Sequence, residues 1–167
     1  FGANCSNPDT KTWKSGFSGS GAALQKRDGT LVSSFVNRQA DNSQHFYFFM
    51  SKDGGESWYV SGTSGTSGAD EPKSLERNNG DLAISVRSSG YNYYNYTSDD
   101  GETWHKPSQT RFTSGISGNA CDGEYMVWCS TLEGNPWDIA LQTLPNSPSR
   151  QNVSIALSTD EGATFGT

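Results

Sequence analysis

The stretch that decides the fold is "SKDGGESW", residues 51–58, which joins a hydroxyl side chain, an aspartate, a glycine, a second hydroxyl and a tryptophan. The same pattern returns as "TSDDGETW" at 97–104 and, with phenylalanine in the last place, as "STDEGATF" at 158–165. Three copies of hydroxyl-x-Asp-x-Gly-x-hydroxyl-aromatic in 167 residues indicate an internal repeat. A repeat has to be interpreted before any single element, because it sets the architecture of the whole chain.

Each copy follows a segment typical of a β-strand, at 45–50, 91–96 and 152–157, and leads into another. We therefore interpret the three copies as hairpin turns and refer to them below as the boxed turns. In such a turn the aspartate accepts hydrogen bonds from backbone amides, the glycine permits positive φ and the aromatic ring packs on neighbouring strands. The aspartates Asp53, Asp99 and Asp160 are accordingly predicted to be structural.

A second turn pattern precedes each boxed turn: Asp28-Gly29, Asn79-Gly80 and Asp122-Gly123. Asx-Gly is the strongest short-range hairpin pattern, and a strand-like segment follows each pair. The predicted unit is thus a four-stranded antiparallel meander, the blade of a β-propeller. We expect an all-β chain with three blades near residues 19–60, 71–106 and 115–167, and with an insertion at 131–149 between the second and third strands of the last blade.

Composition agrees with short strands and tight turns. Hydrophobic residues make up 32% of the chain, charged residues 18%, and the mean hydropathy is −0.71. A net charge of −6 and a pI near 4.8 argue against nucleic acid or an anionic membrane surface as a partner. No segment has the length of a membrane span, and the cysteines Cys5, Cys121 and Cys129 lack metal-ligand spacing, so no cofactor or metal site is predicted.

The meander separates two ends of the propeller. The boxed turns and the turns after the first strands lie at one end. The start of each first strand, the end of each second strand and the start of each third strand lie at the other. That second end is predicted to carry Glu71, Arg87 and Arg150, one carboxylate and two guanidinium groups. For any one of them the ordinary alternative is a solvated surface charge.

Further residues are predicted at the same end. Trp137 and Asp138 belong to the insertion, and Tyr91 closely follows Arg87, so all three are candidates for substrate contact. Loop packing is an equally good explanation for the first two, and strand packing for Tyr91. Glu76 is the rival carboxylate, but its place late in the strand predicts the opposite end.

These patterns resemble the Asp-box, or BNR, repeats of the sialidase (neuraminidase) and trans-sialidase superfamily. The segment "GSGAAL" at 19–24, followed by "DGTLV" at 28–32, is similar to a segment of that family. "DEPKSLERNNGDLAISVR" at 70–87 resembles the segment with the catalytic glutamate and, sixteen residues later, the second arginine of a triad. "PNSPSRQNVSIALSTDEGATF" at 145–165 resembles the segment with the third arginine.

The resemblance implies a six-bladed propeller and an exo-α-sialidase that hydrolyses terminal sialic acid from glycoconjugates with retention. Glu71 would activate a tyrosine nucleophile, while Arg87 and Arg150 would bind the carboxylate of the sugar. It also implies a sialylated glycan as partner, no cofactor, and a secreted or cell-surface location.

The family's first arginine, acid/base aspartate and tyrosine have no match here. Motif order would put the first two before Phe1 and the tyrosine after Thr167. We therefore expect about half of a propeller and half of an active site, with the remainder supplied by further sequence or another chain. Three alternatives stay open: an inactive sialic-acid-binding module, a trans-sialidase, and a structural Asp-box propeller of another functional class. An upstream arginine and aspartate with a downstream tyrosine would favour the enzyme.

Overall fold

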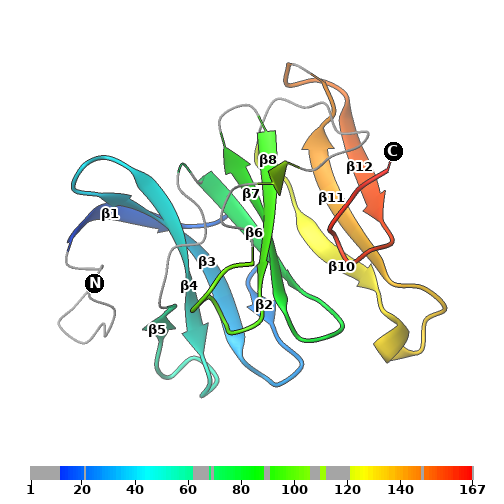
Figure 1. Cartoon of the computed structure of the whole chain (residues 1–167), viewed down its shortest axis with the longest axis horizontal. Coiled ribbons are helices and arrows are strands. Elements are labelled where there is room, and N and C mark those ends of the chain that lie inside the picture. The colour runs from blue at the N-terminus through cyan, green and yellow to red at the C-terminus, as the bar shows by residue number, and fades with distance from the viewer. Residues whose placement is uncertain are drawn as a thin grey trace.

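The computed structural model describes residues 12–20, 22–61, 68, 70–88, 91–105, 110–111, 121–147 and 149–166. These residues form three antiparallel sheets that follow one another along the chain, as Figure 1 shows. The expectation of three blades in an all-β fold is thereby confirmed. In the described part of the chain, no helix is long and apolar enough to cross a membrane.

The first sheet has five strands, because two short segments share the place of the first strand. Both β1 and β2 pair with β3, at opposite ends of that long strand, and β4 and β5 complete the sheet. The sequence did not predict β1. The bounds are β1 Trp13–Ser18, β2 Leu24–Gln25, β3 Leu31–Gln39, β4 Gln44–Ser51 and β5 Tyr59–Val60.

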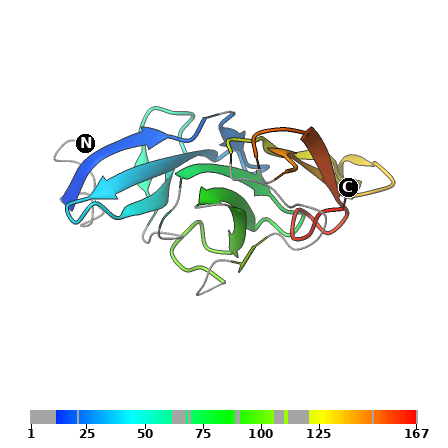
Figure 2. The same cartoon turned by 90° about the horizontal axis from the view of Figure 1, so that it is seen from above.

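The second sheet is a regular meander in the order β6-β7-β8-β9, and it stands between the other two (Figure 2). The third sheet has the order β10-β11-β12, and the bridge between Leu157 and Gly166 marks a fourth strand position. The bounds are β6 Asp70–Glu76, β7 Leu82–Ser88, β8 Tyr91–Thr97, β9 Thr110–Arg111, β10 Tyr125–Cys129, the 3₁₀-helix η2 Thr131–Glu133, β11 Ile139–Pro145 and β12 Val153–Ser158.

The third sheet corrects one prediction. Asp122-Gly123 does not form the first hairpin of this blade; it precedes β10, which is the first strand. Gly123 is needed for close approach instead, because a Cβ there would lie 1.9 Å from the carbonyl oxygen of Thr143 in β11. The inserted residues therefore fall between the first and second strands, with η2 among them, and not between the second and third.

Apolar side chains fill the two spaces between adjacent sheets. The aromatic residues that end the second and third boxed turns pack into the space before their own sheets: Trp104 meets Phe46 of β4 at 5.1 Å between ring centroids, and Phe165 meets Tyr125 of β10 at 6.1 Å. Trp58 of the first boxed turn is exposed. The first cluster contains Val32, Val36, Phe46, Phe48, Met50, Leu82, Ile84 and Val86; the second contains Leu75, Ala83, Tyr94, Tyr125, Ala140, Leu144, Ala156 and Phe165. Burial of this apolar surface is the main force that holds the sheets together.

Candidate active site

The boxed turns form one end of the molecule, and their aspartates are occupied by their own turns. In the second turn, Thr97 Oγ1 donates to Asp99 Oδ1 at 2.7 Å and accepts the N–H of Gly101 at 3.0 Å. Asp99 in turn accepts the N–H and the hydroxyl of Thr103, at 2.8 and 2.6 Å. The first and third turns repeat these contacts atom for atom.

These hydrogen bonds keep the boxed carboxylates ionised. Those from Ser57 and Ser51 lower the pKa of Asp53 to about 2. For Asp99 and Asp160, burial raises the pKa, but the hydrogen bonds from their turns outweigh it, so the pKa stays below the ordinary value. A carboxylate committed in this way is a poor proton acceptor for a substrate, and the boxed turns therefore hold the fold together.

Glu71 lies at the opposite end of the second sheet, in an unusual backbone conformation. Asp70 pairs with Arg87 and Pro72 pairs with Val86, so Glu71 is the extra residue of a β-bulge. Its φ is +42°, and within the described residues no other non-glycine residue has positive φ inside a strand. The following Pro72 has no N–H to contribute to the ladder, and a bulge is one of the few places where a strand tolerates that. Left-handed conformations of such residues cluster at functional sites.

Beside the bulge, the Glu71 carboxylate contacts the guanidinium of Arg87. Arg87 Nη1 donates to Glu71 Oε2 at 2.6 Å and lies 3.5 Å from Asp70 Oδ2. The hydrogen bond to Glu71 raises the pKa of Arg87 above its ordinary value, against the opposing effect of burial. Both side chains keep about a quarter of their surface exposed, at 25% and 26%, so the pair is accessible to a ligand. Asp70 is a site neighbour that the sequence reasoning missed, although its place next to Glu71 in the segment could have suggested it.

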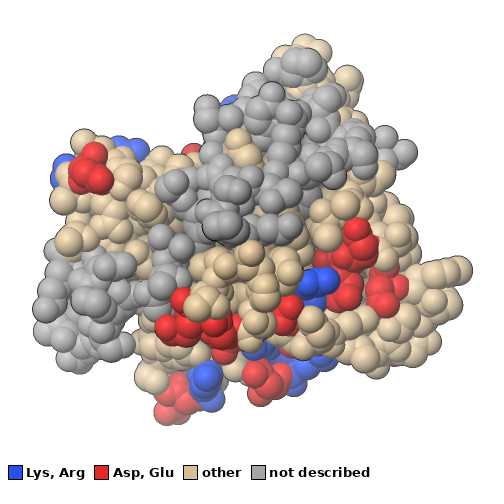
Figure 3. Space-filling view, in the orientation of Figure 1, with Lys and Arg blue, Asp and Glu red and all other residues tan. Residues whose placement is uncertain are grey.

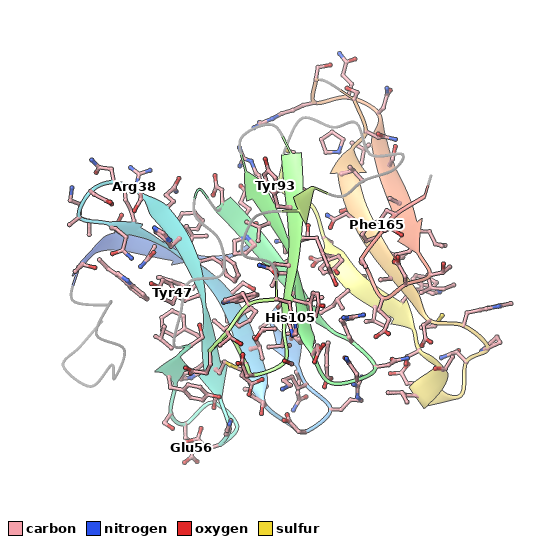
Figure 4. The ribbon with its side chains drawn as sticks, viewed as in Figure 1. Arg38, Tyr47, Glu56, Tyr93, His105 and Phe165 are labelled. Carbon is pink, nitrogen blue, oxygen red and sulfur yellow. The ribbon has the colours of Figure 1, made fainter. Side chains whose placement is uncertain are left out.

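The other predicted residues are less closely gathered. Arg150 lies in the loop between β11 and β12, with an exposed side chain that makes no hydrogen bond or ion pair with the described residues. Tyr91 begins β8, next to the end of β7, but its side chain lies outside the described part of the structure. Figure 4 shows Tyr93 near this upper end of β8 and Glu56 of the first boxed turn at the lower end.

Glu76 is a structural carboxylate at the same end of the molecule as the boxed turns. Its Oε2 accepts the N–H of Arg27 at 2.8 Å, and its Oε1 lies 3.4 Å from the Arg27 guanidinium. The Arg27 side chain also donates to the carbonyl oxygen of Arg77, at 2.6 Å. Acidic and basic side chains stand side by side over this lower part of the face (Figure 3). Glu76 thus joins the first and second sheets and is distant along β6 from Glu71.

The placement predicted for Trp137 and Asp138 is wrong. They lie between β10 and β11, and the η2 segment of this connection stands at the lower end in Figure 1, with the β6–β7 turn. Asp138 Oδ1 accepts from Asn78 Nδ2 at 2.6 Å, and the N–H of Asn78 donates to Glu161 of the third boxed turn. Hydrogen bonds from Thr131 and Asn78 lower the pKa of Asp138. The reason for the error is the strand order of the third sheet, which moves the insertion to the end away from Glu71.

The sequence pattern of BNR repeat-like domains matches residues 7–167, nearly the whole chain. The chain belongs to the BNR repeat-like domain family. Among curated protein sequences, nothing matches the chain. Solved structures do resemble this BNR repeat-like chain, and those reported next are all sialidases or trans-sialidases.

A Hadza microbial sialidase, Hz136, is 26% identical with a TM-score of 0.80, over 92% of this chain and 30% of its own. Trypanosoma rangeli sialidase in complex with sialic acid is 22% identical with a TM-score of 0.76, over 92% and 26%. The intramolecular trans-sialidase from Ruminococcus gnavus in complex with oseltamivir carboxylate is 20% identical with a TM-score of 0.68, over 89% and 33%. The BNR chain therefore has the fold of a sialidase propeller and spans about a quarter to a third of the length of these relatives.

Proposed function

We propose that the full-length protein is an exo-α-sialidase that hydrolyses terminal sialic acid with retention of configuration. The observation that carries this proposal is the Glu71–Arg87 pair, held by a left-handed bulge at the end of the propeller away from the boxed turns. Membership of the BNR repeat-like family and the likeness to sialidase structures support the same assignment.

The chemistry of sialic acid suits these side chains. The sugar bears a carboxylate on its anomeric carbon, and an arginine fork binds a carboxylate through two parallel hydrogen bonds. Arg87 contacts Glu71 and Asp70 through Nη1 alone, and its Nε and Nη2 have no partner in the described residues. Those two nitrogens are the edge that we assign to the substrate carboxylate, with Arg150 as the second fork.

Glu71 is assigned the role of general base. Sialidases are the glycosidases with a tyrosine nucleophile, and a phenol with a pKa near 10 needs a base beside it at neutral pH. A carboxylate nucleophile would be repelled by the carboxylate of the sugar, whereas Glu71 can take the phenolic proton without attacking the sugar. The acid/base aspartate, the tyrosine and the first arginine are proposed to come from the rest of the protein.

The remainder of the propeller is proposed to cover the outer face of the third sheet. Alternate side chains of β12 point away from the second sheet and are open to solvent: Val153 is 85% exposed and Ile155 65%. Met126 and Trp128 of β10 are exposed as well. An exposed apolar face of this kind marks a contact surface, and a further blade would pack against it as the second sheet packs against the first. A secreted or cell-surface location is part of the proposal.

The test is direct. Purified full-length protein should release a fluorophore from an α-sialoside, and proton NMR should detect α-sialic acid as the first product. Appearance of the β-anomer first would contradict retention, and the absence of fluorophore release would contradict the proposed sialidase activity. If the sugar binds without release, the inactive binding module replaces the proposal. Added lactose tests the trans-sialidase alternative, and sialyllactose as the main product would identify a transferase.

A further inference from the structure

Lys73 is a buried charge that the proposed chemistry does not use. It lies in β6 two residues after Glu71, and only 6% of its side chain is exposed. A lysine so well covered needs partners, because an unpaired ammonium group is costly to remove from water. Lys73 Nζ lies 3.2 Å from Asp122 Oδ1 and donates to Ser20 Oγ at 3.3 Å, and Ser20 Oγ itself donates to Asp122 Oδ2.

The three residues, named here the Lys73 tie, come from three different sheets. Ser20 stands between β1 and β2, Lys73 is in β6, and Asp122 lies three residues before the start of β10. The tie therefore joins the first strands of consecutive blades to one another. Such a contact between segments 50 to 100 residues apart adds little to local folding, and fixes mainly how the sheets stand relative to each other at this end.

The same part of β6 is also held by the residue next to Ser20. A Cβ at Gly19 would lie 2.5 Å from the carbonyl oxygen of Pro72, so the backbone of the first sheet rests directly on the residue after Glu71. Pro72 itself is buried. The two residues that follow the left-handed Glu71 are thus fixed by close packing at Pro72 and by the ion pair of the buried Lys73.

From this geometry we infer that Ser20, Lys73 and Asp122 are positioning residues that keep the Glu71 bulge in register with Arg87. The inference rests on the proposed role of Glu71 as general base. A bulge residue in a left-handed conformation can relax to a different φ if its strand is released, and its carboxylate would then move with it. Catalysis is sensitive to such movement, since a displacement of about 1 Å can lower a rate about a hundredfold.

The experiment compares Lys73→Met and Lys73→Arg with the parent in the full-length protein, on a fluorogenic α-sialoside. We expect Lys73→Met to lower kcat by about tenfold or more while KM changes by less than about twofold, because the base acts in the transition state. Lys73→Arg, which restores the charge pair with Asp122, should recover kcat to within about threefold. Should Lys73→Met fail to fold, Asp122→Asn removes the same ion pair by an isosteric change at an exposed position. It is expected to show the same fall in kcat with little change in KM.

Arg27→Met is the matched control, since Arg27 forms a comparable tie to Glu76 between the first two sheets at the other end. It should lower the melting temperature as Lys73→Met does but leave kcat unchanged. Equal losses of kcat in both variants, or no loss in Lys73→Met, would overturn the positioning role. The activity of the parent separates failure of the positioning role from failure of the proposed function. A parent without sialidase activity rejects the proposed function, whereas an active parent with an unaffected Lys73→Met variant rejects only the positioning role of the Lys73 tie.

Discussion

Arg87 Nη1 donates to Glu71 Oε2 at 2.6 Å across the β6–β7 pair, although Glu71 is the extra residue of a bulge and Asp70 is the residue paired with Arg87. In a regular ladder, the register that pairs Pro72 with Val86 would put Glu71 opposite Arg87. The bulge puts Asp70 there instead and gives Glu71 its φ of +42°, so both carboxylates lie beside one guanidinium. The hairpin register thus turns a spacing of sixteen residues in the sequence into an ion pair at the end of one hairpin. It gives the carboxylate and the guanidinium a fixed geometry before any ligand arrives.

Replacement of Glu71 by glutamine should remove basicity and keep the shape. In the full-length protein we expect turnover of an α-sialoside to fall by about two to four orders of magnitude, the usual range for a general base. Binding of sialic acid, measured by calorimetry, should change little, because the base contributes mainly in the transition state. Glu76→Gln is the control on the same strand, and it should leave turnover nearly intact. If Glu76→Gln loses turnover and Glu71→Gln keeps it, Glu76 is the general base and Glu71 is not.

The two candidate carboxylate forks can be tested by conservative substitution. Arg87→Lys and Arg150→Lys keep the charge but lose the bidentate geometry, so each should weaken a sialic acid analogue by about tenfold or more, equivalent to one charged hydrogen bond. Arg38→Lys, at an exposed position of β3, is the control and should bind like the parent. Titration calorimetry or inhibition constants measure the effect. Lysine variants that bind with parental affinity would contradict the proposal that Arg87 and Arg150 bind the carboxylate of the sugar.

Much of the fold followed from local patterns in the sequence. The boxed turns and the first two Asx-Gly turns were predictable because their contacts are made within a few residues, as in the set on Asp99. The third Asx-Gly pair was misread since Gly123 serves a contact with Thr143, twenty residues away, which no local pattern encodes. β1 was missed for a similar reason: "WKSGFS" has little strand character, and its pairing with β3 stabilises it.

The site was predictable only in part. Spacing alone places Glu71 and Arg87 at one end of a hairpin, and the structure has them there. The positive φ of Glu71 and the Lys73 tie depend on how three sheets pack, so they could not be predicted from spacing. Trp137 and Asp138 moved to the other end once the strand order of the third sheet was known. The catalytic role of Glu71 stays a prediction.

Asp99→Ala should lower stability in a pH-dependent way. At pH 7 the loss of the turn hydrogen bonds is expected to cost about 1–3 kcal/mol of unfolding free energy. Because the folded-state pKa of Asp99 lies below its unfolded value, the charged carboxylate stabilises the parent above the unfolded pKa, and this part is lost as pH falls through the folded pKa. The gap between parent and variant should therefore narrow as the pH is lowered below about 4. Urea unfolding at pH 7, 4 and 3 measures this difference in unfolding free energy. A difference that does not depend on pH would contradict the stabilising role of the ionised Asp99 carboxylate.

A pair of glycines separates backbone strain from packing in the third boxed turn. Gly162 and Gly134 have nearly the same φ, +82° and +84°. A Cβ at Gly162 would lie 2.1 Å from the hydroxyl oxygen of the fully buried Tyr125, whereas nothing lies within 4 Å of a Cβ at Gly134. Alanine at either site carries the strain of a left-handed residue, about 1 kcal/mol, but only Gly162→Ala must also displace Tyr125.

We therefore expect Gly134→Ala to lower the melting temperature slightly, and Gly162→Ala to cost about 2–4 kcal/mol in total, in the range of overpacked cores. The measurement is thermal or urea unfolding of both variants in the full-length protein. Tyr125→Phe provides the internal check: it removes the hydroxyl oxygen that the new Cβ would meet, along with its hydrogen bond to the Gly162 carbonyl oxygen at 3.1 Å. In that background the added cost of Gly162→Ala should shrink but stay above that of Gly134→Ala, because the ring carbons Cε2 and Cζ would still lie 2.7 Å from the new Cβ. If both glycine variants are equally stable in the parent, the third boxed turn does not pack on Tyr125 as described.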